Sequence, residues 1–446
     1  MNPPVPTGAS HEVGPSEMFF STTNSTGVIT QANSVFVRLS RYNREQLIGA
    51  PHNVIRHPSM PGGAFLLMWE TLKAGKPFCA YVDNLAADGS RYTVFATITP
   101  LGDDYLSVRI RPRRTDLVDA THSLYGSVRP GELLSRREGA SAHAAAVHGL
   151  DELATLLAGA GFPNYDEFIR LALPDEVRLR LEAGEGIPER SGVSGPTADL
   201  LRTTSTLHGR LLAWAAQLDE LDELADALLA GGVRLEETVA GSEQTAAEFS
   251  AAVAQQDGFS PILAGVTLWT QMIGTIGGEV SALRERLSEL RVSAAETRLR
   301  IALSVLQCQT LGQFAAELID QVPGSEAARP AMASLVAALR AGVTDAATSA
   351  VANAALAAAV ADEIDVLAEL AAVPTGLLEG WRVMASSRRD ALVERLLPRV
   401  AEVVATSAGD VEALGALAVR CRGIEPLDAD PLRAELDQIE AVAAHV

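Results

Sequence analysis

Apolar and polar positions follow two different patterns along this chain of 446 residues. Up to residue 115 they change over short distances, as in a mixed α+β domain. Beyond residue 195 they repeat every three or four positions over long stretches, which is typical of packed helices. The pattern predicts a disordered lead-in at 1–17, an α+β domain at 18–115, a helical junction and linker at 116–195, and an all-α region at 196–446.

In the α+β domain, the longest predicted helix covers residues 62–74, because Phe65, Met68, Trp69 and Leu72 recur at helical spacing. The other expected elements are a strand from 28–29, helices at 34–39 and 43–48, and strands at 78–84, 92–99 and 105–110. The second short helix has Asn43 as its N-cap, Gln46 three residues later and Gly49 at its end. The last strands form a meander with a hairpin turn at Asp88-Gly89.

Two series of positions in the all-α region are separated alternately by three and four residues. The first series is Thr204, Leu207, Leu211, Trp214, Leu218, Leu221, Ala225 and Leu228. The second is Ile276, Val280, Leu283, Leu287, Leu290, Ala294, Thr297, Ile301, Ser304, Cys308, Leu311, Ala315 and Leu318. A repeat near 3.5 residues predicts a coiled-coil seam or a bundle of long antiparallel helices.

Prolines and glycines interrupt the remaining helical pattern. In the junction we expect helices at 151–158 and 165–173, the second ending at Pro174, and a linker at 183–196. Later helices are expected around 350–372 and 386–405, with Pro398 kinking or breaking the last. Residues 260–278 are uncharged, but they contain Pro261, glycines and polar residues and lack flanking basic residues. A buried helix is therefore favoured over a membrane span.

Net charge and cysteine content restrict the possible partners. The net charge of -20 argues against nucleic acid and anionic membrane, which need clustered cations. Cys79, Cys308 and Cys421 are too far apart for a redox pair and are expected to be reduced thiols in a cytoplasmic protein, with Cys79 and Cys308 as packing residues. There are no spaced metal ligands, no nucleophile elbow and no framed carboxylate pair, so an enzyme is not expected.

The richest polar motif is the turn at residues 51–61, PHNVIRHPSMP, which three prolines bound. Each proline fixes its own φ and restricts the preceding residue, so the segment cannot continue as an ordinary helix. Such a turn holds His52, Asn53, Arg56 and His57 in fixed directions. These residues suit either ligand binding or a stiff surface loop whose polar groups meet water.

From Phe19 to Arg111 the chain resembles the PAS domain of bacterial aerotaxis receptors, which are flavin-binding redox sensors. The matching stretches are FFSTTNSTGVITQAN, FVRLSRYNREQLIGAPHNVIRHPSMP, FLLMWETLKAGKP, YVDN and DGSRYTVFATITP, and LYGSVRPGELLSRREG resembles the segment that follows. The resemblance implies a PAS fold with bound FAD. Carried over by position, its ligand residues are Asn33, His52, Asn53, Arg56, His57, Trp69 and Asn84.

Chemistry agrees with these roles. Arg56 and His57 could offer cationic donors to pyrophosphate or to a reduced, anionic flavin. The Asn84 amide can both donate and accept at the edge of the ring, and Trp69 offers a stacking face, although a tryptophan on an apolar helix face is more often core. His57 between Arg56 and Pro58 could instead only cap the turn.

The chain also departs from the family pattern. Ser59 replaces an aspartate, Phe78 a tryptophan, and Tyr92-Thr93 an aromatic pair, while Leu85-Ala86-Ala87 after Asp83 replaces a basic run. Losing those cations weakens the case for a dinucleotide phosphate. The alternatives are haem, with His52 or His57 as axial ligand, or a PAS domain without ligand that acts as a dimerisation or docking module.

The sequence thus predicts an α+β PAS domain followed by an all-α coiled-coil or helical-bundle region. We expect a sensory signal-transduction protein without a membrane span, dimeric through its helical region, that relays redox, oxygen or energy state to an unknown protein partner.

Overall fold

The computed structural model describes residues 4–254, 260–388 and 391–445. Contacts group the chain into two compact units. The first comprises Met1–Ala215, Arg298–Ala346 and Asp428–Val446, and the second comprises Ala216–Thr297 and Ala347–Leu427. The predicted all-α region 196–446 therefore contributes to both units, and the first unit contains more than the α+β domain and the junction.

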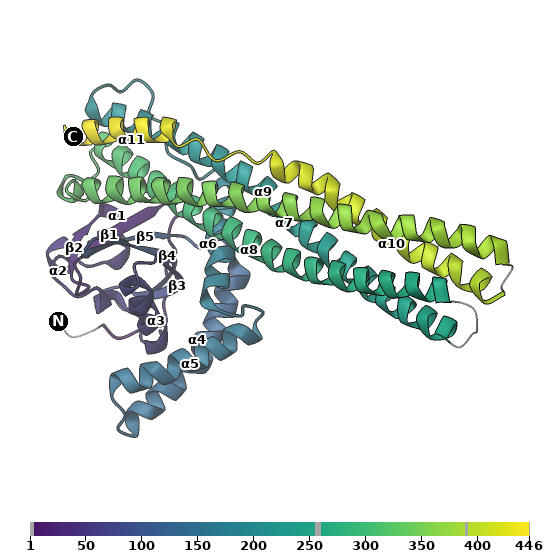
Figure 1. Ribbon diagram of the computed structural model, residues 1–446. Helices are drawn as coiled ribbons and strands as arrows, with labels where there is room; N and C mark the ends of the chain where they lie inside the picture. Colours follow the sequence, from purple (N-terminus) through teal and green to yellow (C-terminus); the bar gives the residue numbers. More distant parts are fainter. Residues whose placement is uncertain (1–3, 255–259, 389–390, 446) are drawn as a thin grey trace. The chain divides into compact units, whose positions relative to one another are not determined.

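An antiparallel five-stranded sheet forms the centre of the first unit (Figure 1), with strand order β2-β1-β5-β4-β3. The strands are β1 Met18–Thr23, β2 Ile29–Ala32, β3 Phe78–Leu85, β4 Arg91–Leu101 and β5 Asp104–Ile110. The predicted strands are confirmed to within two residues at each end, apart from the first, for which the sequence predicts only the start. Gly89 takes a positive φ of 81° in the turn between β3 and β4, as the Asp-Gly signal predicts.

Short helices between β2 and β3 cover one face of the sheet. They are α1 Ser34–Ser40, α2 Arg44–Leu47, the 3-10 turn His52–Ile55 and α3 Gly62–Lys73. Asn33 caps α1 by accepting a hydrogen bond from the Phe36 amide, and Asn43 and Gln46 form the predicted capping box of α2. This arrangement of sheet and helices is the α+β PAS fold that the sequence predicted.

Strand β1 was not predicted. Its sequence MFFSTT shows no alternation, because all six residues are buried. Phe19 packs with Phe36 and Tyr92 beneath the helices, whereas Phe20 meets Phe314 on the opposite face. A strand covered on both faces lacks the alternating signal of a half-exposed strand.

The segment before β1 differs from the disordered lead-in that was predicted for residues 1–17. Backbone hydrogen bonds join Thr7 to Gly89 and residues 9 and 11 to Arg91. The His11 ring contacts Ser90 Oγ at 2.9 Å and the Leu39 carbonyl at 3.0 Å, and Val13 is buried. The described residues from 7 to 17 therefore pack against the α+β domain.

Three helices follow the sheet: α4 Thr115–Arg137, α5 Ala142–Gly159 and α6 Tyr165–Glu182. Helix α6 continues through Pro174, so the predicted end at that residue is wrong. Helix α5 approaches α3 so closely that a Cβ on Gly63 would lie 2.4 Å from the Leu150 nitrogen. No helix or strand covers residues 183–195, which agrees with the predicted linker, although Glu185 within it is buried.

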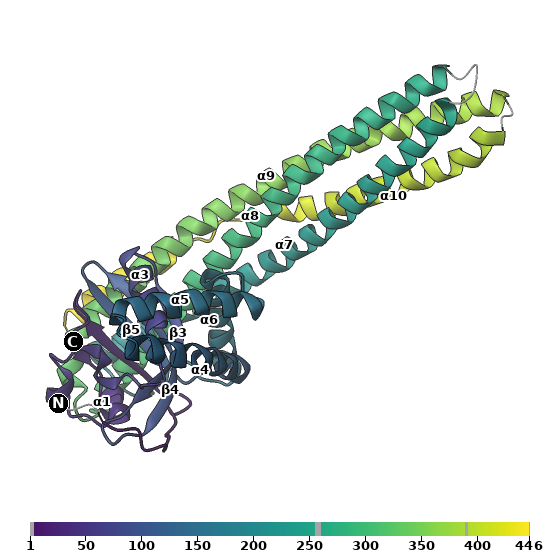
Figure 2. The same cartoon turned by 90° about the horizontal axis from the view of Figure 1, so that it is seen from below.

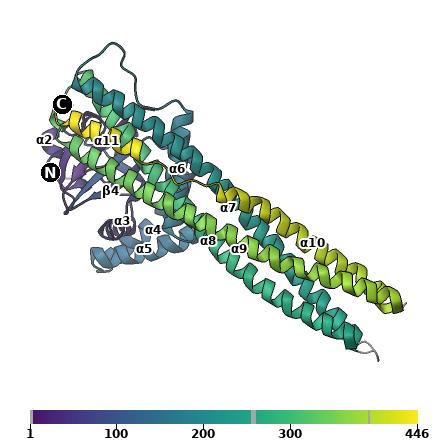
Figure 3. The same ribbon diagram turned by 45° about the horizontal axis from the view of Figure 1, so that its top comes forward.

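Long helices make up the second unit: α10 Ala391–Arg422 together with parts of α7 Pro196–Ala254, α8 Ser260–Ile319 and α9 Ala331–Arg388. Figures 1, 2 and 3 show these stretches side by side. Ion pairs join α7 to α8 (Glu236–Arg284), α8 to α9 (Glu363–Arg286), α9 to α10 (Asp365–Arg422) and α10 to α7 (Arg399–Glu248). The unit is thus a four-helix bundle. The short turn Glu326–Ala328 and α11 Asp430–Ala443 belong to the first unit.

Every residue of the two predicted seams is buried. Of the two interpretations of that repeat, the antiparallel bundle within one chain is the observed one, since Asp226 and Glu236 of α7 pair with Arg291 and Arg284 of α8 respectively. Helix α10 runs on through Pro398. The helix predicted at 386–405 is divided between α9 and α10, and residues 389–390 fall outside the described part.

The uncharged stretch 260–278 begins α8, and the side chains of residues 260–264 are outside the described part. Its later residues Trp269, Ile273 and Ile276 are buried. Among the described residues, no helix combines the length and apolar character that a membrane crossing requires.

Candidate functional site

A cavity of about 290 Å³ lies between the sheet and the helices of the PAS domain. Its floor comes from β3, β4 and β5, and its walls come from the proline-bounded turn and from α3. Most of the lining is apolar. Of the residues that the resemblance implied, the structure places these at the cavity: His52, Asn53, Arg56, Trp69 and Asn84.

Helix α3 contributes Trp69, and neighbouring helices fix its position. The α3 N-terminus has no side-chain cap of its own. Instead, the buried Glu132 carboxylate of α4 accepts hydrogen bonds from the Gly62 and Gly63 amides at 2.7 and 2.8 Å. Glu132 belongs to the segment that resembles the part following the PAS domain in aerotaxis receptors, so that segment helps to build the cavity wall.

The Trp69 ring lies at the cavity opposite a glycine. A Cβ on Gly27, whose φ is +78°, would lie 3.1 Å from the ring, so only glycine allows this approach without displacement. Trp69 also meets Tyr105 edge to face at 5.6 Å between centroids. The indole is therefore held in place while part of it lines the cavity.

The two histidines of the turn lie in different places: His52 lines the cavity and His57 does not. The His57 Nδ1 contacts Ser59 Oγ at 2.6 Å and accepts from the Ser59 amide, so His57 braces the turn and does not line the cavity. Arg56 does line it, with its guanidinium 3.9 Å from the Phe65 ring centre and donating to the Met60 carbonyl. Burial, then the nearby Arg129, lowers the pKa of Arg56 to about 10, so it stays charged at neutral pH.

Asn33 is also outside the cavity lining. Its side chain caps α1, accepts from the Phe20 amide and donates to the Met18 carbonyl. The structure thus gives Asn33 and His57 supporting contacts at the positions that the resemblance assigns to ligand residues.

Asn84 is the clearest candidate for ligand contact. It is 3 % exposed and lines the cavity, yet its Nδ2 donor has no hydrogen-bond partner. The backbone of the turn holds this part of β3, through a bridge between Arg56 and Asn84 and a hydrogen bond from His57 to the Asp83 carbonyl. A buried donor without an acceptor costs about 1–3 kcal/mol, which an acceptor on a ligand would recover.

Sequence reasoning missed Arg109 of β5. It is 4 % exposed, lines the cavity, and donates to Ser21 Oγ at 3.1 Å. Its Nη2 lies 2.5 Å from His52 Nε2. Burial, then the charge of Arg109, lowers the pKa of His52 well below its usual value, so this ring is neutral and Nε2 is the acceptor.

A signal for Arg109 exists in the sequence. Along β5 the residues Leu106, Val108 and Ile110 are buried, while the alternate residues Tyr105, Ser107 and Arg109 line the cavity. Polar residues on the second face of a strand that is covered on both sides indicate a hollow or a ligand.

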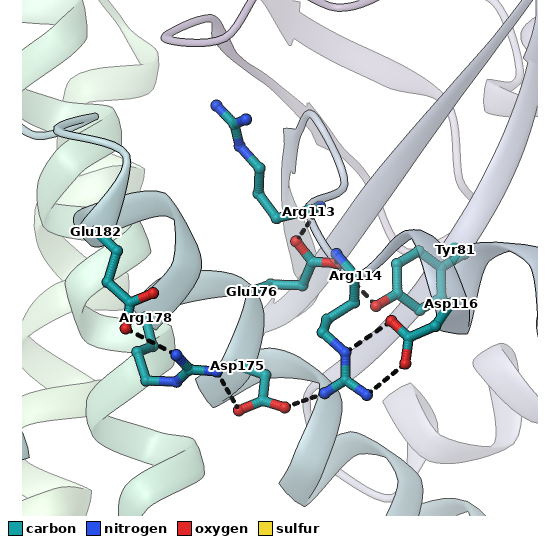
Figure 4. A network of polar contacts seen from close by, with 8 residues as sticks. All are labelled: Tyr81, Arg113, Arg114, Asp116, Asp175, Glu176, Arg178 and Glu182. Carbon is teal, nitrogen blue, oxygen red and sulfur yellow. Dashed lines mark hydrogen bonds and ion pairs between the residues drawn. The ribbon is translucent and has the colours of Figure 1, made fainter.

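The opposite face of the sheet is packed by helices. Tyr81 of β3 donates to the carboxylate of Glu176 on α6 at 2.8 Å, and the Arg113 and Arg114 amides donate to the same carboxylate at 2.6 and 2.9 Å. Figure 4 shows this carboxylate between Tyr81 and the chain that leaves β5. Burial raises the pKa of Glu176, and the hydrogen bonds oppose this effect.

Side-chain ion pairs extend the same network. Arg114 binds both oxygens of Asp116, at 2.8 and 2.7 Å, and also reaches Asp175, which Arg178 contacts in turn (Figure 4). The hydrogen bond from Arg114 lowers the pKa of Asp116 to about 2. The junction between β5 and α4 is therefore tied to α6.

Helices α4 and α8 contact the PAS domain as well. His122 of α4 contacts Asp83 of β3 at 3.1 Å, next to Asn84 along the strand. Glu317 of α8 accepts from Ser34 at the start of α1 at 2.7 Å. Helical segments distant in sequence thus meet the domain at β3 and at α1.

The cysteines show no reactive environment. All are free and buried, and burial raises the pKa of Cys79 to about 12 and that of Cys421 to about 11. The predicted packing role of Cys79 and Cys308 agrees with these surroundings. No cluster of three or more potential metal ligands occurs in the described ranges.

Comparisons with known proteins concern the N-terminal part. No family model matches the chain. The aerotaxis receptor of Escherichia coli (strain K12) is 38% identical over 121 residues, which are 26% of this chain and 24% of the receptor. The chain thus matches about a quarter of the length of that relative. The PAS domain is similar to that of an aerotaxis receptor, as the sequence motifs indicated.

Solved structures of light-oxygen-voltage domains also match. One, described in a study of a flavin analogue, is 20% identical with a TM-score of 0.22, covering 24% of this chain and 84% of its own. The Rhodobacter sphaeroides LOV protein is 15% identical with a TM-score of 0.21, covering 32% of this chain and 89% of its own.

Proposed function

We propose that the PAS domain is a sensory module that holds a flavin, FAD, in its cavity and relays the redox state of the flavin to the helices around the sheet. One observation carries the proposal: the buried Asn84 Nδ2 lines the cavity without a hydrogen-bond partner. The similarity of residues 19–111 to an aerotaxis receptor supports the choice of flavin. Sensing by the whole protein is part of this proposal.

The residues fit this ligand. Asn84 would donate to an acceptor on the ring edge, and Trp69 would pack against the ring. Arg56 and Asn53, on the turn, would meet the phosphates. When bound, a flavin supplies a group whose charge and hydrogen-bonding pattern change on reduction.

The volume of the cavity indicates which part of FAD it would hold. The cavity volume of about 290 Å³ is at the small end of ligand pockets, which run from ~300 to ~1,000 Å³. We infer that the ring fills it and that the rest of FAD passes the exposed Asn53 at its rim. Leu85 and Ala86 are buried and Ala87 packs against the core, so this segment offers no cation to the phosphates and the turn residues would have to bind them.

Strand β3 offers the route for relay. Asn84 faces the cavity, while its neighbour Asp83 holds His122 of α4 and Tyr81 holds Glu176 of α6. A ligand-dependent shift of β3 would alter both helix contacts, which is a local change read by a larger element. A protein partner of the helical region and a homodimer complete the proposal.

The absorption spectrum of the purified full chain tests this function. We expect flavin bands after incubation with FAD, and loss of at least tenfold in FAD affinity in Asn84→Leu. Asn353→Leu is the matched control, since it replaces a buried amide of the second unit that is hydrogen-bonded to Ser293 and Thr297. A folded chain that takes up no flavin would contradict the proposal.

A ligand-free docking module is the second candidate. It is favoured by the contacts of Asn33 and His57, which support the fold instead of lining the cavity. Partner binding that survives replacement of both Arg56 and Asn84 would select it. Haem is not supported, since His57 is outside the cavity and His52 Nε2 is engaged by Arg109.

A further inference from the structure

Arg109 is a buried cation whose charge no carboxylate balances. Its contacts are Ser21 Oγ, the neutral His52, and the ring faces of Phe19 and Phe36 at 5.5 and 5.3 Å. In the part of the chain that the structure describes, no Asp or Glu forms an ion pair with it. Burial lowers its pKa to about 10, which still leaves it protonated at neutral pH.

Another buried arginine of the same unit shows the usual solution. Arg180 is 1 % exposed and pairs with Glu185 at 3.0 Å, with Gln309 and two backbone carbonyls completing its contacts. Removing a charge from water costs several kcal/mol, so buried charges are normally paired. Arg109 differs from Arg180 in having its open side at a cavity.

We propose that Arg109 makes the inner end of the cavity selective for the form of the flavin ring that carries negative charge. This inference rests on the proposed function and assigns a residue outside the set that the resemblance implied. Depth separates its role from that of Arg56. Arg109 is buried on the central part of the sheet, whereas Arg56 is half-buried on the turn, beside Arg129. Arg109 therefore meets the ring, and Arg56 meets the phosphates.

Reduction changes the charge of the flavin ring. Two electrons from a chemical reductant and one proton from solvent leave the reduced ring with one negative charge. A fixed cation beside the ring favours that form over the oxidised, neutral ring and over a reduced ring that has taken up a second proton. Arg109 should thus raise the midpoint potential of the flavin. It should also keep the reduction a one-proton process down to a lower pH than for free FAD.

The test is a dithionite titration of the full chain loaded with FAD, repeated across the pH range. For the wild-type chain we expect the midpoint potential of the bound flavin to fall by about 30 mV per pH unit, which is the slope of a two-electron, one-proton reduction. This one-proton slope should extend to lower pH than it does for free FAD. In Arg109→Gln the reduced-to-oxidised ratio should fall at least tenfold at fixed potential, equivalent to about 30 mV. Arg137→Gln, which removes an exposed charge of α4, is the matched control and should change the ratio by less than twofold.

A second readout uses riboflavin, FMN and FAD with the same variants. Loss of a ring contact should weaken all three by the same factor in Arg109→Gln, whereas Arg56→Gln should weaken FMN and FAD more than riboflavin. If Arg109→Gln does not fold, Arg109→Lys serves in both experiments. The lysine charge should preserve the one-proton slope of the midpoint potential at low pH. A pH dependence equal to that of free FAD would refute the proposal.

The possible failures are distinct. A wild-type chain that binds no flavin removes the proposed function. Two other results would remove only the assignment of Arg109. One is that the midpoint potential of the bound flavin depends on pH as that of free FAD does. The other is that Arg109→Gln loses affinity for FMN and FAD but not for riboflavin.

Discussion

The two faces of the PAS sheet treat buried polar groups in opposite ways. On the helix-packed face, the Glu176 carboxylate receives three hydrogen bonds, from Tyr81 and from the Arg113 and Arg114 amides. On the cavity face, Asn84 Nδ2 has no partner and Arg109 has no counter-charge among the described residues. Both faces belong to the same strands, so local sequence preference does not explain the difference.

The contrast distinguishes structural from functional polarity. A satisfied buried group contributes to folding, and its removal leaves its partners without hydrogen bonds. An unsatisfied group weakens the fold and is retained where something else supplies the missing partner. Paired groups should therefore control stability, and unpaired groups should control ligand binding.

The largest effect should follow Glu176→Ala. It leaves two partly buried backbone donors and the buried Tyr81 hydroxyl without their acceptor, so we expect a loss of about 3 kcal/mol or more in the free energy of unfolding. Urea denaturation followed by tyrosine and tryptophan fluorescence measures it. Glu182→Ala, an exposed position on the same helix, should cost less than about 0.5 kcal/mol. Equal losses in the two variants would break the comparison.

The next largest effect on stability should distinguish two buried asparagines, Asn353 and Asn84. Asn353→Leu removes an amide that is bonded to Ser293 and Thr297, and should cost about 2 kcal/mol. Asn84→Leu removes an unpartnered donor and should leave the stability of the ligand-free chain unchanged or raise it by up to about 1 kcal/mol. Thermal unfolding of both variants decides the point. A larger loss for Asn84→Leu would mean that its amide has a partner in the fold.

A smaller effect concerns the contact between α8 and α1. Ser34→Ala removes the 2.7 Å hydrogen bond to the buried Glu317, and should cost about 1–2 kcal/mol. A double-mutant cycle with Glu317→Gln isolates the pair. Additive losses would show that the contact contributes nothing to holding the helix on the domain.

The smallest effect is a pH dependence at α4. The hydrogen bond with Asp83 raises the pKa of His122, while burial opposes this; Asp83 and Asp119 favour its charged form and Arg91 disfavours it. Because the folded pKa exceeds the unfolded one, the contribution is complete at low pH and lost as pH rises through the raised value. We expect amide protection of α4, corrected for intrinsic exchange, to fall as the pH rises above 6.5, the ordinary pKa of histidine. In His122→Gln it should not change with pH.

Much of the fold was readable from the sequence. Caps and turn residues located α2 and the β3–β4 hairpin, because Asn43, Gly49 and Gly89 act through local backbone geometry. Strand β1 was not readable, since Phe19 and Phe20 both find apolar partners and the alternation disappears. Pro174 and Pro398 did not end their helices, and at the buried Pro174 tertiary packing overrode local preference.

The candidate site was readable only in part. The turn was recognisable, but which of His52 and His57 reaches the cavity depends on the 3-10 geometry that places them. Arg109 lies in a run with Arg111 and Arg113 at the same alternation, and only the end of β5 at Ile110 distinguishes Arg109, which lies on the strand and lines the cavity, from the other two. Distant contacts such as Glu317 with Ser34 have no signal in a single sequence.

Hydrogen exchange of the full chain with and without FAD tests the central claim most directly. We predict protection by FAD of the turn His52–Arg56, of α3 around Trp69 and of β3 at Asn84, and loss of that protection in Asn84→Leu. No protection at these segments, or protection confined to α6 and the opposite face of the sheet, would contradict the assignment of the unpaired face to ligand binding.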